Sequence, residues 1–281
     1  MGKLHDRMRE DLLLKAYSPH TQKAYLRCAR NFANHYMRSP EEMGEKEIRS
    51  FLLHLVRDRK ASPATLGMYI NALKFLYTIT LKRPEEVKGI SHPKRPKTLP
   101  VILSPEEVLR VFEAIRSVKY KAITATAYAA GLRISEVCGL RIADIDSRRR
   151  RIHIRSGKGN KDRYVMLGES LLALLRQYYQ AVRPQGEYLF PGQKPQRHIS
   201  TTAVSLVLRK VIRETGLAKK VTMHTLRHCF ATHLLEAGTD IRILQVLLGH
   251  SSIRTTLRYT HITDRLVQKL VSPLDMIHPA S

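Results

Sequence analysis

Apolar residues recur at helical spacing in three stretches of the first 90 residues. Positions three and four apart are apolar and the positions between them polar, which is typical of a helix with one buried face. Two of these helices begin at Ser18-Pro19 and Ser62-Pro63, where a capping hydroxyl precedes a proline at the first helical position. We expect a small all-helical domain. The three apolar stripes are Tyr25, Ala29, Phe32, Ala33 and Tyr36; Ile48, Phe51, Leu52, Leu55 and Val56; and Leu66, Tyr69, Ile70, Leu73 and Tyr77.

The pattern changes after a proline-rich, basic stretch. Ser104 opens a capping box with Glu107, and helical spacing resumes behind it. Residues 150–167 instead alternate apolar and polar positions on both sides of a Gly-Lys-Gly-Asn turn, which predicts a β-hairpin. Helical patterns then return, and the last of them ends at Gly238.

These patterns predict a fold that is mainly α with a small antiparallel β-sheet (α+β). We expect a helical domain at 1–89, an extended basic linker at 90–103, and a mixed domain at 104–281. A length of 281 residues suits two domains, each large enough to bury a core.

Composition narrows the class of protein. No apolar run approaches the roughly 18 residues that a membrane span needs. The N-terminus is charged throughout, which is not typical of a signal peptide. The three cysteines, Cys28, Cys138 and Cys229, are an odd number without a CxxC pair. This argues against a disulfide scaffold or a zinc ribbon and favours the reducing cytoplasm.

The charge is strongly positive. Lys and Arg number 49 against 24 Asp and Glu, a formal net charge of +25. The excess is present on both sides of the expected linker, so it is not a basic tail. It indicates a polyanionic partner, with nucleic acid favoured and an anionic membrane surface as the alternative. A merely solubilising surface charge stays open as well.

Several kinds of chemistry have no support in the sequence. There is no GxxxxGK[ST] phosphate loop, no GxSxG elbow and no GxGxxG after a strand. His224 and His228 have the spacing of an HExxH zinc site, but Thr225 stands where the glutamate would be. Acidic residues that could hold Mg²⁺ are scattered. We therefore expect neither a cofactor nor a metal.

Basic groups and tyrosines remain, and they suit chemistry on a phosphodiester. Arginine offers forked hydrogen bonds to the non-bridging oxygens of a phosphate, and a lysine at a hairpin tip could protonate a leaving oxygen. Taken singly, each such residue is more often an ion-pair partner, a cap or a surface group. Their order along the chain favours a joint catalytic role. The candidates are Arg133, Lys158, His224, Arg227, His250 and Tyr259.

The strings that hold these residues resemble the active-site segments of the tyrosine recombinase (phage integrase) family. They are GLRISEVCGL, SGKGNKDR, HTLRHCFATHLLEAGTDIRILQVLLGH and TTLRYTHI, and the resemblance covers essentially the whole chain. HTLRH, ATHLLEAG and the later SPLD look most like integron integrases. Those enzymes carry an extra insertion before HTLRH for which the interval from Phe190 to His224 is too short, so a Xer-like or mobile-element recombinase is the preferred subfamily.

The resemblance implies a site-specific recombinase that cuts and rejoins DNA through a covalent 3′-phosphotyrosine, without ATP or metal. Tyr259 would be the nucleophile, and His224 would act in proton transfer at it. Lys158 would protonate the departing 5′-oxygen. The scissile phosphate would be held by Arg133, Arg227 and His250, with Glu136 orienting Arg133.

The same resemblance makes 1–89 a core-binding domain and 104–281 the catalytic domain with a C-terminal tail. The tail would dock onto a neighbouring subunit, giving a homotetramer on two DNA duplexes in the prokaryotic cytoplasm, at the nucleoid. Packing of the tail on its own domain is the alternative. Two other functions stay open: a type IB topoisomerase, and a DNA-binding regulator with a decayed active site.

Overall fold

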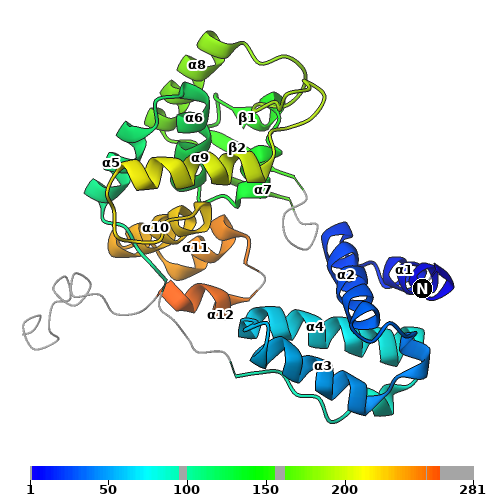
Figure 1. The fold of residues 1–281 in the computed structure, drawn as a ribbon. Helices are drawn as coiled ribbons and strands as arrows, with labels where there is room; N and C mark the ends of the chain where they lie inside the picture. Colours follow the sequence, from blue (N-terminus) through cyan, green and yellow to red (C-terminus); the bar gives the residue numbers. More distant parts are fainter. Residues whose placement is uncertain (1, 95–99, 156–161, 251, 260–281) are drawn as a thin grey trace, which may run out of the picture. The chain divides into compact units, whose positions relative to one another are not determined.

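The computed structural model describes residues 2–94, 100–155, 162–250 and 252–259. The chain forms two compact units, Met1–Thr98 and Leu99–Ser281. Figure 1 shows the N-terminal unit as helices only and a small sheet among the helices of the C-terminal unit. This confirms the mainly helical α+β fold class that the sequence predicts.

The N-terminal unit contains four α-helices within its described residues. The Ser18 and Ser62 hydroxyls accept hydrogen bonds from the N–H groups of Thr21 (3.3 Å) and Thr65 (3.2 Å), so both expected caps are present. The elements are α1 (Gly2–Leu14), α2 (Pro19–Tyr36), α3 (Glu45–Arg57) and α4 (Pro63–Phe75), with a π-helical turn at Leu76–Thr80 and 3-10 turns at Pro40–Glu42 and Pro84–Val87.

Aromatic rings fill the core of this unit. The Phe32 ring lies 5.2 Å from that of Phe51 and 6.4 Å from that of Tyr77, measured between centroids. The hydroxyl of the fully buried Tyr77 donates to the Pro40 carbonyl at 3.0 Å, which satisfies its polar end. The core thus supports the three helices that the apolar stripes predict.

The C-terminal unit carries the longer series of elements. In chain order they are α5 (Pro105–Ala114), α6 (Val118–Ala129), α7 (Ile134–Cys138), η4 (Ile142–Asp144), β1 (Ile145–Asp146), β2 (Arg151–Ile154), β3 (Arg163–Met166), α8 (Glu169–Val182), α9 (Thr201–Glu214), α10 (Met223–Glu236), α11 (Ile241–Leu248), α12 (Ile253–Thr256) and η5 (Leu257–Tyr259).

The expected β-hairpin is present. Strands β2 and β3 pair antiparallel, with Ile152 opposite Val165, and both of these side chains are buried. The two-residue strand β1 adds to the other edge of β2, giving the order β1-β2-β3. The hairpin tip, 156–161, lies outside the described residues.

Helix α6 is the centre of the C-terminal unit. Successive residues from Ala122 to Ala127 are buried, as expected of a helix enclosed on all sides. It packs against both α8 and α10, so the turn that follows α6 lies beside α10. Figure 1 shows α10, α11 and α12 grouped together, away from α8 and β1.

Across the described part of the chain, we find no helix with the length and apolar character that crossing a bilayer requires.

Candidate active site

Arg133 and Glu136 occupy the first turn of α7. Arg133 is the N-cap residue, and its backbone N–H donates to Glu136 Oε2 at 2.9 Å. The Arg133 guanidinium donates to the other carboxylate oxygen at 2.7 Å. Glu136 therefore caps the helix and fixes the side chain of Arg133 at the same time.

Glu136 also holds a second arginine, which the sequence reasoning missed. The two Nη groups of Arg163 donate to the two carboxylate oxygens at 3.0 and 2.8 Å. Burial alone would raise the pKa of Glu136, but hydrogen bonding to Arg163 and the charges of Arg163 and Arg133 lower it to about 2. The carboxylate is therefore ionised at neutral pH.

One signal in the sequence could have revealed Arg163. It stands two residues before the inward-facing Val165, and alternate residues of a strand share a face. An arginine at an inward position of a half-buried strand needs a buried partner, which Glu136 supplies.

Arg227, in the second turn of α10, is almost completely buried at 1% exposure. Its guanidinium donates to the carbonyls of Gly131 (2.6 Å) and Leu248 (2.5 Å). Its Nη2 lies 3.2 Å from His250 Nε2, and its Nη1 lies 3.8 Å from Glu136 Oε2. Burial, followed by the charge of Arg133, lowers the pKa of Arg227 to about 10, so the group stays positive near neutrality.

Two glycines in left-handed conformation shape the backbone around Arg227. Gly131 has a φ of +60°, and a Cβ there would lie 2.3 Å from a ring carbon of Phe230. Gly249 has a φ of +59° and ends α11, directly after the carbonyl that Arg227 binds and directly before His250. The chain turns that carry these carbonyls thus depend on glycine.

Tyr259 lies in the 3-10 turn after α12 and is 5% exposed. Its hydroxyl is 2.8 Å from Nδ1 of His228, which also lies on α10. The Tyr259 ring is nearly parallel to that of His250, at 8° with centroids 6.5 Å apart. His250 Nδ1 in turn lies 3.0 Å from the Thr256 hydroxyl. These contacts place Tyr259 beside the His250 end of the cluster.

His224 is the exposed member of a histidine pair on α10. Its ring lies 4.3 Å from that of His228, one helical turn later, at 68°. The sequence reasoning considered His228 only as a possible zinc ligand and gave it no part in the reaction. Its position four residues after His224, and thus on the same helix face, was the available signal.

The structure therefore connects several of the sequence candidates. Arg133 and Arg227 meet around Glu136, and Arg227 reaches His250. Tyr259 contacts His228, and the ring of His224 lies beside that of His228. Lys158 lies outside the described residues. Within the described ranges, no three His, Cys, Asp or Glu side chains form a group that could hold a metal ion.

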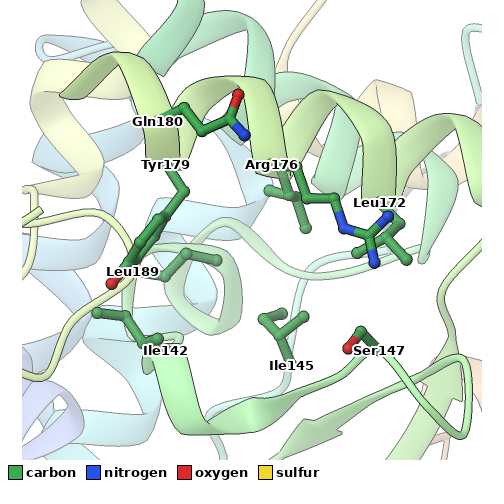
Figure 2. Close-up of a pocket in the computed structure, with 9 residues that line it drawn as sticks. Ile142, Ile145, Ser147, Leu172, Arg176, Tyr179, Gln180 and Leu189 are labelled. Carbon is green, nitrogen blue, oxygen red and sulfur yellow. The ribbon is translucent and has the colours of Figure 1, made fainter. Parts of the chain in front are cut away.

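A separate cavity of about 380 Å³ lies between α8 and the β1 region (Figure 2). Its lining is mainly apolar, with Arg176 and Gln180 of α8 adding polar groups. None of the site candidates lines it, so this cavity is distinct from the cluster around Glu136.

Comparison with known proteins identifies the class of protein. The Phage integrase family matches residues 102–265, and the phage integrase N-terminal SAM-like domain matches residues 4–86. A putative integrase/recombinase, y4qK, of Sinorhizobium fredii is 42% identical over 99% of this chain and 90% of its own. The tyrosine recombinase XerA of Pyrococcus horikoshii is 34% identical over 84% of each chain.

A solved structure agrees with these sequence matches. The XerH site-specific recombinase, bound to its difH substrate in a pre-cleavage complex, is 26% identical with a TM-score of 0.66. The match covers 87% of this chain and 76% of that one. The chain therefore belongs to the phage integrase family of tyrosine recombinases, and similarity to XerA and XerH fits the Xer-like subfamily. It is a site-specific recombinase that cuts and rejoins DNA strands.

Proposed function

We propose that Arg133, Arg227 and His250 bind the scissile phosphate and that Tyr259 is the nucleophile that attacks it. The observation that carries this proposal is the convergence of both arginines on Glu136, with His250 3.2 Å from Arg227. Two buried or half-buried guanidinium groups need a balancing anion. Glu136 is already shared with Arg163, so the cluster keeps an excess of positive charge to offer a phosphate.

The chemistry follows from these positions. The Tyr259 oxygen attacks phosphorus and the bond to the 5′-oxygen breaks, which leaves a 3′-phosphotyrosine and a free 5′-hydroxyl. Lys158 supplies the proton to the leaving oxygen, and His224 acts in proton transfer at the tyrosine. The covalent bond conserves the energy of the broken phosphodiester, so ATP is not needed. The arginines and the lysine supply the positive charge that a metal ion would otherwise bring.

The wider assembly is part of the proposal. Residues 1–89 act as the core-binding domain and 104–281 as the catalytic domain, joined by the linker at 90–103. Net positive charge in both halves suits a clamp around duplex DNA, and the similar XerH recombinase is seen bound to its difH substrate. The C-terminal tail, residues 264–281, lies outside the described residues. In this proposal it docks on a neighbouring subunit to give four copies on two duplexes, in the cytoplasm at the nucleoid.

The test uses a nicked target duplex that traps the covalent intermediate, with candidate sites taken from the DNA that flanks the gene. Wild-type protein should form an adduct that survives denaturing electrophoresis. Tyr259→Phe should form none while shifting the same duplex in a native gel with unchanged affinity. An adduct formed by Tyr259→Phe would show that another residue is the nucleophile.

A further inference from the structure

The hydroxyl of Tyr259 is bonded to a histidine that the proposed reaction does not use. His228 Nδ1 lies 2.8 Å from that oxygen, a distance suited to direct proton transfer. We propose that His228 is a catalytic residue that takes the proton from Tyr259 during strand cleavage and returns it during rejoining. This inference rests on the proposed function, in which Tyr259 is the nucleophile, and it deepens the proton transfer there: His228 contacts the hydroxyl directly, and His224, whose ring lies 4.3 Å from that of His228, acts in proton transfer behind it.

Burial makes the contact selective. His228 is 9% exposed and Tyr259 5%, and their rings pack with centroids 5.4 Å apart. Little water can reach the bond between them, which favours transfer of the proton to the imidazole. His228 is also held by the middle of α10, which packs against α6 and α11. The base therefore sits on a rigid element beside the reacting atom.

The chemistry of the two groups fits this task. A tyrosine has an ordinary pKa of about 10, so at neutral pH its proton must leave as the oxygen attacks. A neutral imidazole has a ring nitrogen with a lone pair that can accept this proton. The hydrogen bond thus joins a nucleophile that needs a base to a group that can act as one.

The step balances in both directions. In cleavage the O–H bond of Tyr259 breaks, its proton moves to His228 Nδ1, and the phenolic oxygen forms the bond to phosphorus. The bond from phosphorus to the 5′-oxygen breaks, and that oxygen takes a proton from Lys158. In rejoining the 5′-hydroxyl attacks phosphorus and returns its proton to Lys158. The tyrosine oxygen then leaves and regains its proton from His228.

The experiment uses a sulfur substitution to separate removal of the proton from Tyr259 from donation of a proton to the leaving 5′-oxygen. Duplexes carry at the cleavage position either an ordinary phosphodiester or a bridging sulfur in place of the 5′-oxygen. Thiolate is a good leaving group and needs no proton, so Lys158→Ala should regain near wild-type cleavage on the sulfur substrate. His228→Ala and His228→Asn should cleave about 10²–10⁴-fold more slowly on both substrates. Rejoining should slow by the same factor, leaving the covalent fraction at equilibrium unchanged.

Asparagine is the informative replacement because its amide can hold the tyrosine hydroxyl but cannot take its proton. Wild-type cleavage by His228→Asn would overturn the proposal, and so would rescue of either variant by sulfur. Faster cleavage by His228→Ala would overturn it too, by showing that the contact only restrains the tyrosine. If His228→Ala fails to fold, His228→Asn decides the matter. Failure of the proposed function gives a different result, an adduct formed by Tyr259→Phe.

Discussion

Arg163 and Glu136 form a forked ion pair in which two nitrogens meet two oxygens at 3.0 and 2.8 Å. Both side chains are less than one-tenth exposed. The Arg163 Nε also donates to the Leu247 carbonyl at 2.9 Å. The Arg163 side chain thus joins three elements: strand β3, helix α7, which carries Glu136 and is capped by Arg133, and the end of helix α11, just before His250.

Replacing Arg163 should disturb both stability and cleavage. Arg163→Met leaves the Glu136 carboxylate short of a buried partner, and removing one member of such a pair typically costs about 3–5 kcal/mol. Urea unfolding measures this loss. Arg163→Lys keeps the positive charge but cannot form the forked hydrogen bonds. Its free energy of unfolding should therefore lie between those of the wild type and Arg163→Met.

An exposed ion pair gives the matched control. Arg150 and Glu169 meet at 2.7 Å, but their side chains are 46% and 87% exposed. Arg150→Met should change stability by only about 0–1 kcal/mol. Equal losses of unfolding free energy for Arg150→Met and Arg163→Met would contradict the claim that a buried ion pair is costlier to break than an exposed one.

Glu136 should make stability depend on pH in the acid range. Its pKa falls from an ordinary 4.5 to about 2 on folding, a shift worth roughly 3 kcal/mol. Because the folded pKa is the lower one, this stabilisation is fully present above about pH 4.5 and is lost as pH falls toward 2. The unfolding free energies of wild type and Glu136→Gln should therefore converge through that window. A constant difference between them would contradict the assignment.

Arg227→Lys should separate catalysis from affinity. Lysine keeps a positive charge but cannot reach the Gly131 and Leu248 carbonyls and a phosphate together, so cleavage should fall about 10²–10³-fold. DNA affinity and its dependence on salt should change little. Adduct formation with saturating protein, beside a binding titration, measures the two effects.

Lys97, in the expected linker and outside the described residues, provides the contrast. Lys97→Ala should reduce the slope of log affinity against log salt by about one, with the cleavage rate of bound DNA unchanged. If Arg227→Lys and Lys97→Ala both weakened only binding, the division between clamp and catalyst would be wrong.

Gly131→Ala should destabilise the turn that Arg227 binds. The residue has a left-handed φ, and the added Cβ would lie 2.3 Å from the Phe230 ring. Backbone strain and overpacking should together cost about 2–5 kcal/mol. Gly216→Ala is the control, with a φ of +66° and open space around it, so it should lose only the strain of about 1–2 kcal/mol. Thermal or urea unfolding of the pair checks the difference.

Local signals explain what the sequence could predict of the fold. Ser18, Ser62 and Ser104 each combine a cap with a following proline, and each begins a helix in the structure. Helix α1 was missed because its buried Leu4, Met8 and Leu12 stand among many charges. Strand β1 was missed because two residues cannot show an alternating pattern.

At the site, too, local contacts could be predicted from the sequence and long-range contacts could not. Arg133 and Glu136 are three residues apart, so their contact follows from local helix geometry. The contact between Arg163 and Glu136, and that between His228 and Tyr259, join residues 27 and 31 positions apart. Such contacts depend on how α7, β3, α10 and η5 pack, which no local pattern encodes. The sequence therefore indicated the reacting groups more readily than the residues that hold them.

The most direct test of the central claim is to locate the DNA on the protein. Wild-type protein trapped on a nicked duplex is digested with nuclease and trypsin, and the nucleotide-bearing peptide is sequenced by mass spectrometry. Cleavage after Arg258 releases residues 259–265, and we predict a 3′-linked nucleotide on Tyr259 in that peptide. A nucleotide on any other residue, or a 5′-linked one, would contradict the account.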